Sequence, residues 1–165
     1  VIIPTYNESK EIGRLLSELK SFDLDCLVVD DGSTDNTSRI AEEHGAMVLK
    51  NEVNLGKGAS LSKGFRFALD KGYDAVITMD GDGQHLPEDV PVLLDNALKS
   101  SSQIFIGNRM EKTHPMPWVR VMTNKFMSSL ISALARQEIP DTQCGFRFIT
   151  KELISKTIIP NITGG

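Results

Sequence analysis

The feature that most constrains the fold is a regular alternation of short apolar runs with segments of helical periodicity. Each run has the length of a strand, and apolar residues at i, i+3, i+4 and i+7 follow it, as at Ile12, Leu15, Leu16 and Leu19. This order predicts an α/β chain with a mostly parallel sheet and helices on both faces. The predicted strands are residues 1–4, 26–29, 46–49, 76–79 and 103–107, with predicted helices after the first four.

Length and composition indicate one globular domain. The chain has 165 residues, of which 40% are hydrophobic and 24% are charged, and these values allow a substantial buried core. The sequence opens on Val1 inside an apolar run and stops at Gly165. We therefore expect residues 1–165 to be a single domain that is truncated at both ends.

Charge and cysteine content exclude several classes of protein. The net charge of -4 argues against a dedicated nucleic-acid binder, which needs a basic face. Cys26 and Cys144 are too few for a disulfide framework or a metal set, so we expect a reducing, cytoplasmic setting. No apolar run approaches the roughly 18 residues of a membrane span. The chain is thus expected in the cytoplasm or on the cytoplasmic face of a membrane.

Polar clusters follow the predicted strands at their carboxyl ends. Ligands of open α/β sheets bind at this edge, because the carboxyl ends of parallel strands meet there. We therefore expect the clusters to come together in one site. They are residues 5–8, 30–35, 80–85 and 108–109.

The strongest chemical signal is the pair Asp80 and Asp82, separated by Gly81 at the end of a predicted buried strand. Two carboxylates this close repel each other, and a divalent cation between them and an anionic ligand would relieve the repulsion. Oxygen ligands suit Mg²⁺ or Mn²⁺. The alternative is a solvated turn that closes the strand.

A second type of segment follows residue 109. Val119, Met122, Phe126 and Leu130 lie on one stripe of a predicted helix over residues 119–134, and basic side chains flank the stripe. Such a helix can rest on a bilayer interface, although packing against a protein core is the commoner arrangement.

Taken in order, the motifs resemble the family 2 glycosyltransferases of the GT-A fold. The resemblance is closest to the dolichyl-phosphate mannose synthase-like branch, which transfers a sugar from a nucleotide sugar to a polyprenyl phosphate. It implies a Rossmann-like sheet and one glycosyltransferase catalytic domain. The motifs that carry it are residues 4–8, 28–35, 54–58, 79–88, 107–109 and 141–147.

The resemblance implies a role for individual residues on the donor side. In the family, the first loop holds the nucleoside, the second motif lies around the base and ribose, and the aspartate pair binds metal together with a nearby glutamine. The positions that match here are Pro4, Tyr6 and Glu8 for the nucleoside, Val29 and Asp31 for base and ribose, Asp80, Gly81 and Asp82 for the donor, and Asp80, Asp82 and Gln84 for Mg²⁺ or Mn²⁺.

On the acceptor side, the resemblance places Arg109 near the sugar phosphate. It also implies that Arg109 is a catalytic residue, together with Asp80 and Asp82. It implies acceptor-phosphate contacts for Arg109, Arg120, Asn124 and Arg147. Guanidinium groups match phosphate oxygens. A phosphate monoester is also largely ionised near neutral pH, so it needs no general base to attack. Attack opposite the diphosphate would invert the anomeric centre.

Several alternatives stay open at this point. The donor can be a UDP- or a GDP-sugar, and the acceptor can carry a hydroxyl instead of a phosphate. A non-catalytic domain that binds a nucleotide sugar has the same motifs. A sugar-nucleotide pyrophosphorylase would need a glycine-rich, arginine-bearing first loop, which residues 4–8 do not form. His85 is expected to make structural hydrogen bonds, and residues 54–58 to be a tight entry to a helix.

Overall fold

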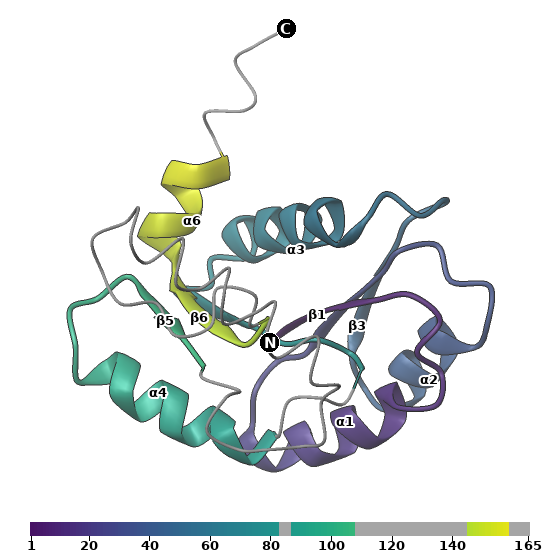
Figure 1. Cartoon of the computed structure of the whole chain (residues 1–165), viewed down its shortest axis with the longest axis horizontal. Helices are drawn as coiled ribbons and strands as arrows, with labels where there is room; N and C mark the ends of the chain where they lie inside the picture. Colours follow the sequence, from purple (N-terminus) through teal and green to yellow (C-terminus); the bar gives the residue numbers. More distant parts are fainter. Residues whose placement is uncertain (83–86, 108–144, 159–165) are drawn as a thin grey trace, which may run out of the picture.

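The computed structural model describes residues 1–82, 87–107 and 145–158, and within them six strands form one sheet (Figure 1). The strand order is β3-β2-β1-β4-β6-β5. The strands are β1 (Ile2–Thr5), β2 (Leu27–Asp30), β3 (Met47–Lys50), β4 (Ala75–Thr78), β5 (Ile104–Ile106) and β6 (Arg147–Thr150).

The sheet is mostly parallel, as the alternating pattern predicted. Strand β1 pairs in parallel with β2 and β4, and β2 pairs in parallel with β3. Strand β6 is antiparallel to both β4 and β5, so β5 runs in the same direction as β4. The sequence analysis predicted neither β6 nor the helix that follows it directly (Lys151–Ile158), because the regular alternation of strands and helices was traced only as far as residue 107.

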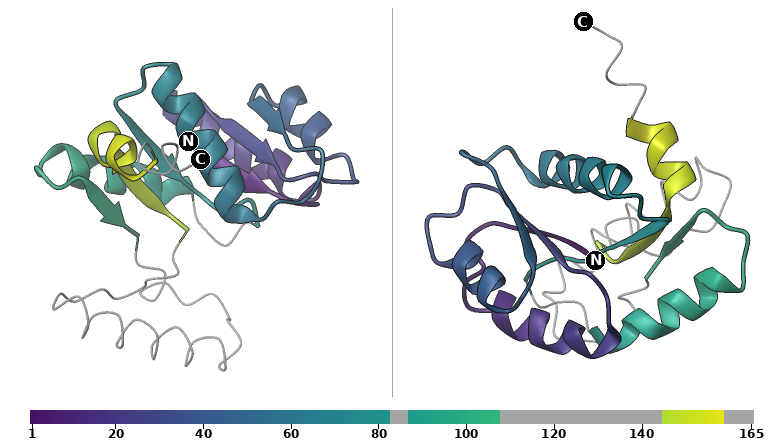
Figure 2. Two further views of the ribbon diagram at one scale, coloured as in Figure 1. Left: turned by 90° about the horizontal axis from the view of Figure 1, so that it is seen from above. Right: turned by 180° about the vertical axis from the view of Figure 1, so that it is seen from behind.

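Helices cover both faces of the sheet (Figure 1; Figure 2 shows the same layers from above and from behind). Helices α3 and α6 lie on one face, and α1, α2 and α4 lie on the other. None of the helices in the described part of the chain has the length and apolar character that crossing a bilayer requires. Their bounds are α1 (Ile12–Leu19), η1 (Lys20–Phe22), α2 (Thr37–Glu43), α3 (Lys57–Asp70), η2 (Pro87–Asp89), α4 (Val90–Leu98) and α6 (Lys151–Ile158).

Alternate residues of the central strands supply the two cores. Ile3 and Val28 point to the face under α1 and α4, whereas their neighbours Ile2 and Val29 point to the face under α3. Ile3, Val28 and Val29 are all fully buried. Because full burial of such a side chain is worth about 1.5–3 kcal/mol, these alternating positions hold the sheet between its two helical layers.

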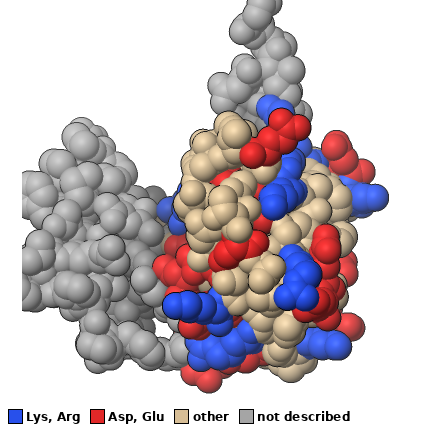
Figure 3. Space-filling model, turned by 90° about the vertical axis from the view of Figure 1, so that its right-hand side faces the viewer, with Lys and Arg blue, Asp and Glu red and all other residues tan. Residues whose placement is uncertain are grey.

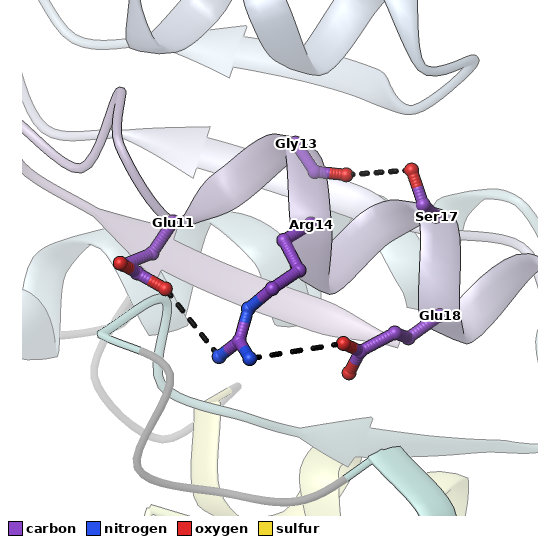
Figure 4. A network of polar contacts seen from close by, with 5 residues as sticks. All are labelled: Glu11, Gly13, Arg14, Ser17 and Glu18. Carbon is purple, nitrogen blue, oxygen red and sulfur yellow. Dashed lines mark hydrogen bonds and ion pairs between the residues drawn. The ribbon is translucent and has the colours of Figure 1, made fainter.

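Helix α1 shows how the outer surface differs from the core. Arg14 pairs with Glu11 at 3.4 Å and with Glu18 at 3.9 Å, and the Ser17 hydroxyl donates to the Gly13 carbonyl at 2.8 Å (Figure 4). All three charged side chains are exposed, and exposed pairs contribute only about 0–1 kcal/mol. The helix therefore owes its place to its buried apolar face.

The carboxyl ends of β1, β2 and β4 lie at one edge of the sheet. Thr5 is in register with Asp30, and the antiparallel pairing puts Arg147, the first residue of β6, opposite Thr78 at the same edge. On the face drawn in Figure 3, the described acidic and basic side chains are interspersed. The predicted helix over residues 119–134 lies outside the described residues.

Candidate functional site

The loops after β1 and β2 are joined by hydrogen bonds at the carboxyl edge. The Asn7 N–H donates to the Ser33 hydroxyl, and the Glu8 N–H donates to the Thr37 hydroxyl, both at 2.9 Å. In return, the Thr34 N–H donates to the Asn7 side-chain oxygen at 2.9 Å. Asn7 has a positive φ of 57°, a backbone conformation that asparagine tolerates better than most residues. The first two motifs therefore form one rigid unit.

The Asp35 carboxylate accepts hydrogen bonds from both parts of this unit. Its carboxylate accepts from the N–H and the hydroxyl of Thr37, at 2.9 and 2.5 Å, and from the Ser9 N–H at 3.2 Å. Burial acts to raise the pKa of Asp35, but the hydrogen bonds from Thr37 and Ser9 outweigh it and lower the pKa to about 2. This carboxylate is therefore ionised and holds the first turn of α2.

Asp31 holds the loop that leads into α3. One carboxylate oxygen accepts from the Asn51 amide at 2.8 Å and from the Leu55 N–H at 2.9 Å, and the other accepts from the Gly56 N–H at 2.7 Å. Burial acts to raise the pKa of Asp31, yet these hydrogen bonds lower it overall. The Asn51 side chain is itself held by Lys63, whose ammonium donates to the amide oxygen at 2.8 Å.

Two positions predicted to contact the base and ribose are thus placed inside the protein. Val29 is fully buried, and its side chain packs in the core under α3; its predicted place around the base and ribose stays a prediction. Asp31 is 4% exposed, with both oxygens accepting from protein donors. The structure therefore shows Asp31 as a clamp on residues 54–56.

Lys57 connects this loop with the aspartate pair. It is the first residue of α3, and its ammonium lies 2.5 Å from a carboxylate oxygen of Asp80. The Asp80 side chain is 18% exposed, and that of Lys57 is 51% exposed. The sequence analysis expected a tight helix entry here, which the start of α3 confirms, but it did not predict that the lysine reaches Asp80.

The loops after β1 and β4 leave neighbouring strands, because β1 and β4 pair in parallel. Burial and, after it, the charge of Asp82 raise the pKa of Glu8. Asp82 is exposed and Asp80 is partly buried. The edge therefore combines an acidic group of Glu8, Asp80 and Asp82 with the ammonium of Lys57.

Gly81, between the two aspartates, packs closely on β1. A Cβ atom at this position would lie 2.8 Å from Cγ2 of Thr5, so a side chain here would have to displace that methyl group. The Thr5 hydroxyl oxygen is buried and has no hydrogen-bond partner among the described residues. The main chain of Gly81 thus lies directly against the end of β1.

The remaining predicted residues divide into two groups. Pro4, Tyr6 and Arg147 lie at the carboxyl edge, where Tyr6 is 46% exposed and Arg147 begins β6. The second group lies outside the described residues and comprises Gln84, His85, Arg109, Arg120 and Asn124.

No cluster of three or more potential metal-binding His, Cys, Asp or Glu side chains occurs in the described ranges.

Comparison with protein families gives one match that covers nearly the whole chain. The model of the family described as "Glycosyl transferase family 2" matches residues 1–158. This range contains every strand and helix of the described structure.

Several curated proteins are similar over most of this chain. The polyprenol monophosphomannose synthase of Mycolicibacterium smegmatis is 32% identical over 94% of this chain and 63% of its own length. The UDP-N-acetylglucosamine–dolichyl-phosphate N-acetylglucosaminyltransferase of Methanococcus voltae is 29% identical, over 93% and 70% of the two chains. The dolichol-phosphate mannosyltransferase of Pyrococcus furiosus is 32% identical, over 93% and 46%.

Solved structures share the fold. Glucosyl-3-phosphoglycerate synthase from Mycobacterium tuberculosis, in complex with phosphoglyceric acid, superposes with a TM-score of 0.70 at 24% sequence identity. The match covers 92% of this chain and 56% of that one, so this chain spans about half the length of that enzyme.

Proposed function

The chain belongs to glycosyl transferase family 2 and has the GT-A fold, and from that membership we propose that it moves a sugar from a nucleotide diphosphate sugar to a polyprenyl phosphate. One observation carries the proposal: Asp80 and Asp82 lie at the carboxyl edge of the sheet, where the ammonium of Lys57 pairs with Asp80 and the charge of Asp82 helps to raise the pKa of Glu8. The names of three relatives support this acceptor class.

The donor's diphosphate fits beside this group of charges. As the glycosidic bond breaks, its electron pair goes to the diphosphate oxygen, so negative charge grows there and needs a positive partner. The ammonium of Lys57, already at the aspartate pair, supplies one such charge. The sugar's anomeric carbon forms its new bond to an oxygen of the acceptor phosphate.

The residues also fit a divalent cation. The described donors are the two carboxylates of Asp80 and Asp82, and Mg²⁺ is commonly held by one or two carboxylates together with substrate phosphates. Such a cation, when bound, would add Lewis-acid neutralisation of the leaving diphosphate. We propose Mg²⁺ or Mn²⁺ with Gln84 as a further ligand. A related solved structure is described as a complex with Mn²⁺ and UDP-glucose.

The nucleoside would lie on the loop after β1. Tyr6 offers an exposed ring between Pro4 of β1 and Glu8, and its loop is fixed by hydrogen bonds to the β2 loop. Gly81 allows the main chain to approach the ligand closely. Val29 and Asp31 act indirectly in this proposal, through the core and through the loop of residues 54–56.

The acceptor phosphate would be held by arginines. Arg147 lies at the carboxyl edge opposite Thr78, and we propose that Arg109, Arg120 and Asn124 join it. A phosphate monoester has its second pKa near about 6, so at neutral pH it attacks as an anion with no proton to remove. Reaction on the face opposite the diphosphate inverts the anomeric centre. Such a lipid acceptor implies contact with a membrane surface, at its cytoplasmic face.

The proposal can be tested by ligand binding. We expect UDP- or GDP-sugars to bind in a Mn²⁺-dependent manner, measured by titration calorimetry, and Asp82→Ala to abolish the Mn²⁺-dependent part. Asp95→Ala is the matched control, because Asp95 is an exposed acid on α4 that pairs with its helical neighbour Lys99. Unchanged Mn²⁺-dependent binding in Asp82→Ala would remove this residue from the site.

A further inference from the structure

Asp80 lies directly against the main chain of Gly145. A Cβ atom built on Gly145 would overlap both carboxylate oxygens and Cγ of Asp80. At position 145, therefore, even the smallest side chain occupies the space that the carboxylate now fills. Gly145 comes from the segment just before β6, far from Asp80 in sequence.

Hydrogen bonds hold the main chain of Gly145 in this place. The buried hydroxyl of Thr78 donates to the Gly145 carbonyl at 2.7 Å. The next residue, Phe146, is buried in the core, and its carbonyl accepts from the Gly107 N–H at 2.8 Å. Because the carbonyls of both residues accept hydrogen bonds, Gly145 and Phe146 cannot move away from Asp80 without losing these bonds.

Asp80 is also held by Lys57. The ammonium lies 2.5 Å from one carboxylate oxygen, and the loop that delivers Lys57 is itself clamped by Asp31 through the N–H groups of Leu55 and Gly56. The carboxylate is therefore confined by Gly145 and by Lys57. A methyl group at position 145 would force it to rotate.

We propose that Gly145 is a positioning residue for Asp80: its bare α-carbon sets the orientation in which this carboxylate receives the donor and its cation. The inference rests on the proposed function, since it concerns the same site. Gly145 also lies two residues before Arg147 in the chain. The same short segment therefore carries a residue for the donor side and one for the proposed acceptor-phosphate site.

The test is Mn²⁺ binding to the free protein, which needs no turnover. In Gly145→Ala we expect Mn²⁺ affinity, measured by electron paramagnetic resonance titration, to fall about 10–100-fold, the usual cost of disturbing a group that orients a ligand. Gly58→Ala is the matched control, because a Cβ at Gly58 meets nothing within 4 Å. Its Mn²⁺ affinity should equal that of the wild type.

A second variant guards against misfolding of Gly145→Ala. Thr78→Val keeps the shape of the side chain and removes the hydrogen bond to the Gly145 carbonyl, so we expect a loss of Mn²⁺ affinity in the same direction, with the circular dichroism spectrum retained. If Gly145→Ala folds and has wild-type Mn²⁺ affinity, the inference is overturned and the proposed function still stands. If Gly145→Ala does not fold, wild-type Mn²⁺ affinity in Thr78→Val has the same consequence. If the wild type binds neither Mn²⁺ nor a nucleotide sugar, the proposed function fails and the inference fails with it.

Discussion

At the level of single residues, Asp31 and Asp80 show how similar sequence contexts lead to different roles. Both follow an apolar strand and precede a glycine. Asp31 is 4% exposed, and its oxygens accept from protein N–H groups, whereas Asp80 faces the ammonium of Lys57 at the edge. The sequence pattern placed both carboxylates at the ends of strands, where the structure has them. It could not separate their surroundings, because the partners Leu55, Gly56 and Lys57 lie more than twenty residues away in the chain.

Lys57 gives the first prediction at this scale. We expect Lys57→Met to weaken binding of UDP or GDP about tenfold, or ~1.4 kcal/mol, because the variant keeps the apolar stem but loses the charge beside Asp80. Fluorescence or calorimetric titration measures the change. Lys71→Met, at the far end of α3, should bind the nucleotide as the wild type does. Equal affinities in both variants would show that the ammonium of Lys57 does not act on the diphosphate.

Asp35 gives a prediction about pH. Its pKa in the folded state is about 2, below the ordinary value of 3.8, so its stabilising effect is present above pH 3.8 and is lost as the pH falls toward 2. Because Asp35 is exposed, solvent screening limits the effect to about 1 kcal/mol. Asp35→Asn should therefore lower the free energy of unfolding at pH 7 and match the wild type near pH 2.

Urea unfolding at a series of pH values measures this difference. Glu42→Gln is the control, since Glu42 is exposed on the same helix. A constant gap between Asp35→Asn and the wild type across the acid range would contradict the assignment of the low pKa to Asp35.

At the level of elements, the loop before α3 and the strand β6 were the least predictable parts. Strands β1 to β5 begin and end within one residue of their predicted positions, because each is a short apolar run bounded by turn residues. Strand β6 runs antiparallel between β4 and β5 and is followed directly by α6, but it lies beyond residue 107, where the alternation traced in the sequence ends. Phe148, Ile149 and Thr150 were the available signal, since such residues favour strands.

Asp31 is the residue on which the loop before α3 depends. We expect Asp31→Asn to lower the free energy of unfolding by about 1–3 kcal/mol, because its amide N–H group would face the N–H of Leu55 or Gly56 and leave a buried donor unpaired. Nucleotide binding should weaken as well, since the loop delivers Lys57. Urea denaturation and nucleotide titration measure the two effects.

Asp74→Asn is the control for this variant, because Asp74 is an exposed aspartate in the loop before β4. Its side chain lies outside the loop of residues 54–56. If Asp31→Asn keeps wild-type stability and wild-type nucleotide affinity, the carboxylate does not clamp the loop.

At the level of the whole molecule, the strand order explains why separate motifs form one site. Strand β1 lies between β2 and β4, so the loop with Tyr6 and Glu8 has the Asp35 loop on one side and the Asp82 loop on the other. The sequence predicted this convergence without the strand order, because the carboxyl ends of parallel strands share one edge whichever strands are neighbours. It could not predict Gly145 at Asp80, because that contact depends on the reversed strand β6.

The central claim is transfer of a sugar to a polyprenyl phosphate, and the most direct measurement is transfer of radiolabelled sugar from UDP- and GDP-sugars. The full-length protein would be offered a short-chain polyprenyl phosphate and, separately, the corresponding polyprenol. We predict label on the phosphate lipid only, in a Mn²⁺- or Mg²⁺-dependent reaction. Label on the free alcohol at an equal rate, or none on the phosphate while nucleotide sugar still binds, would contradict it.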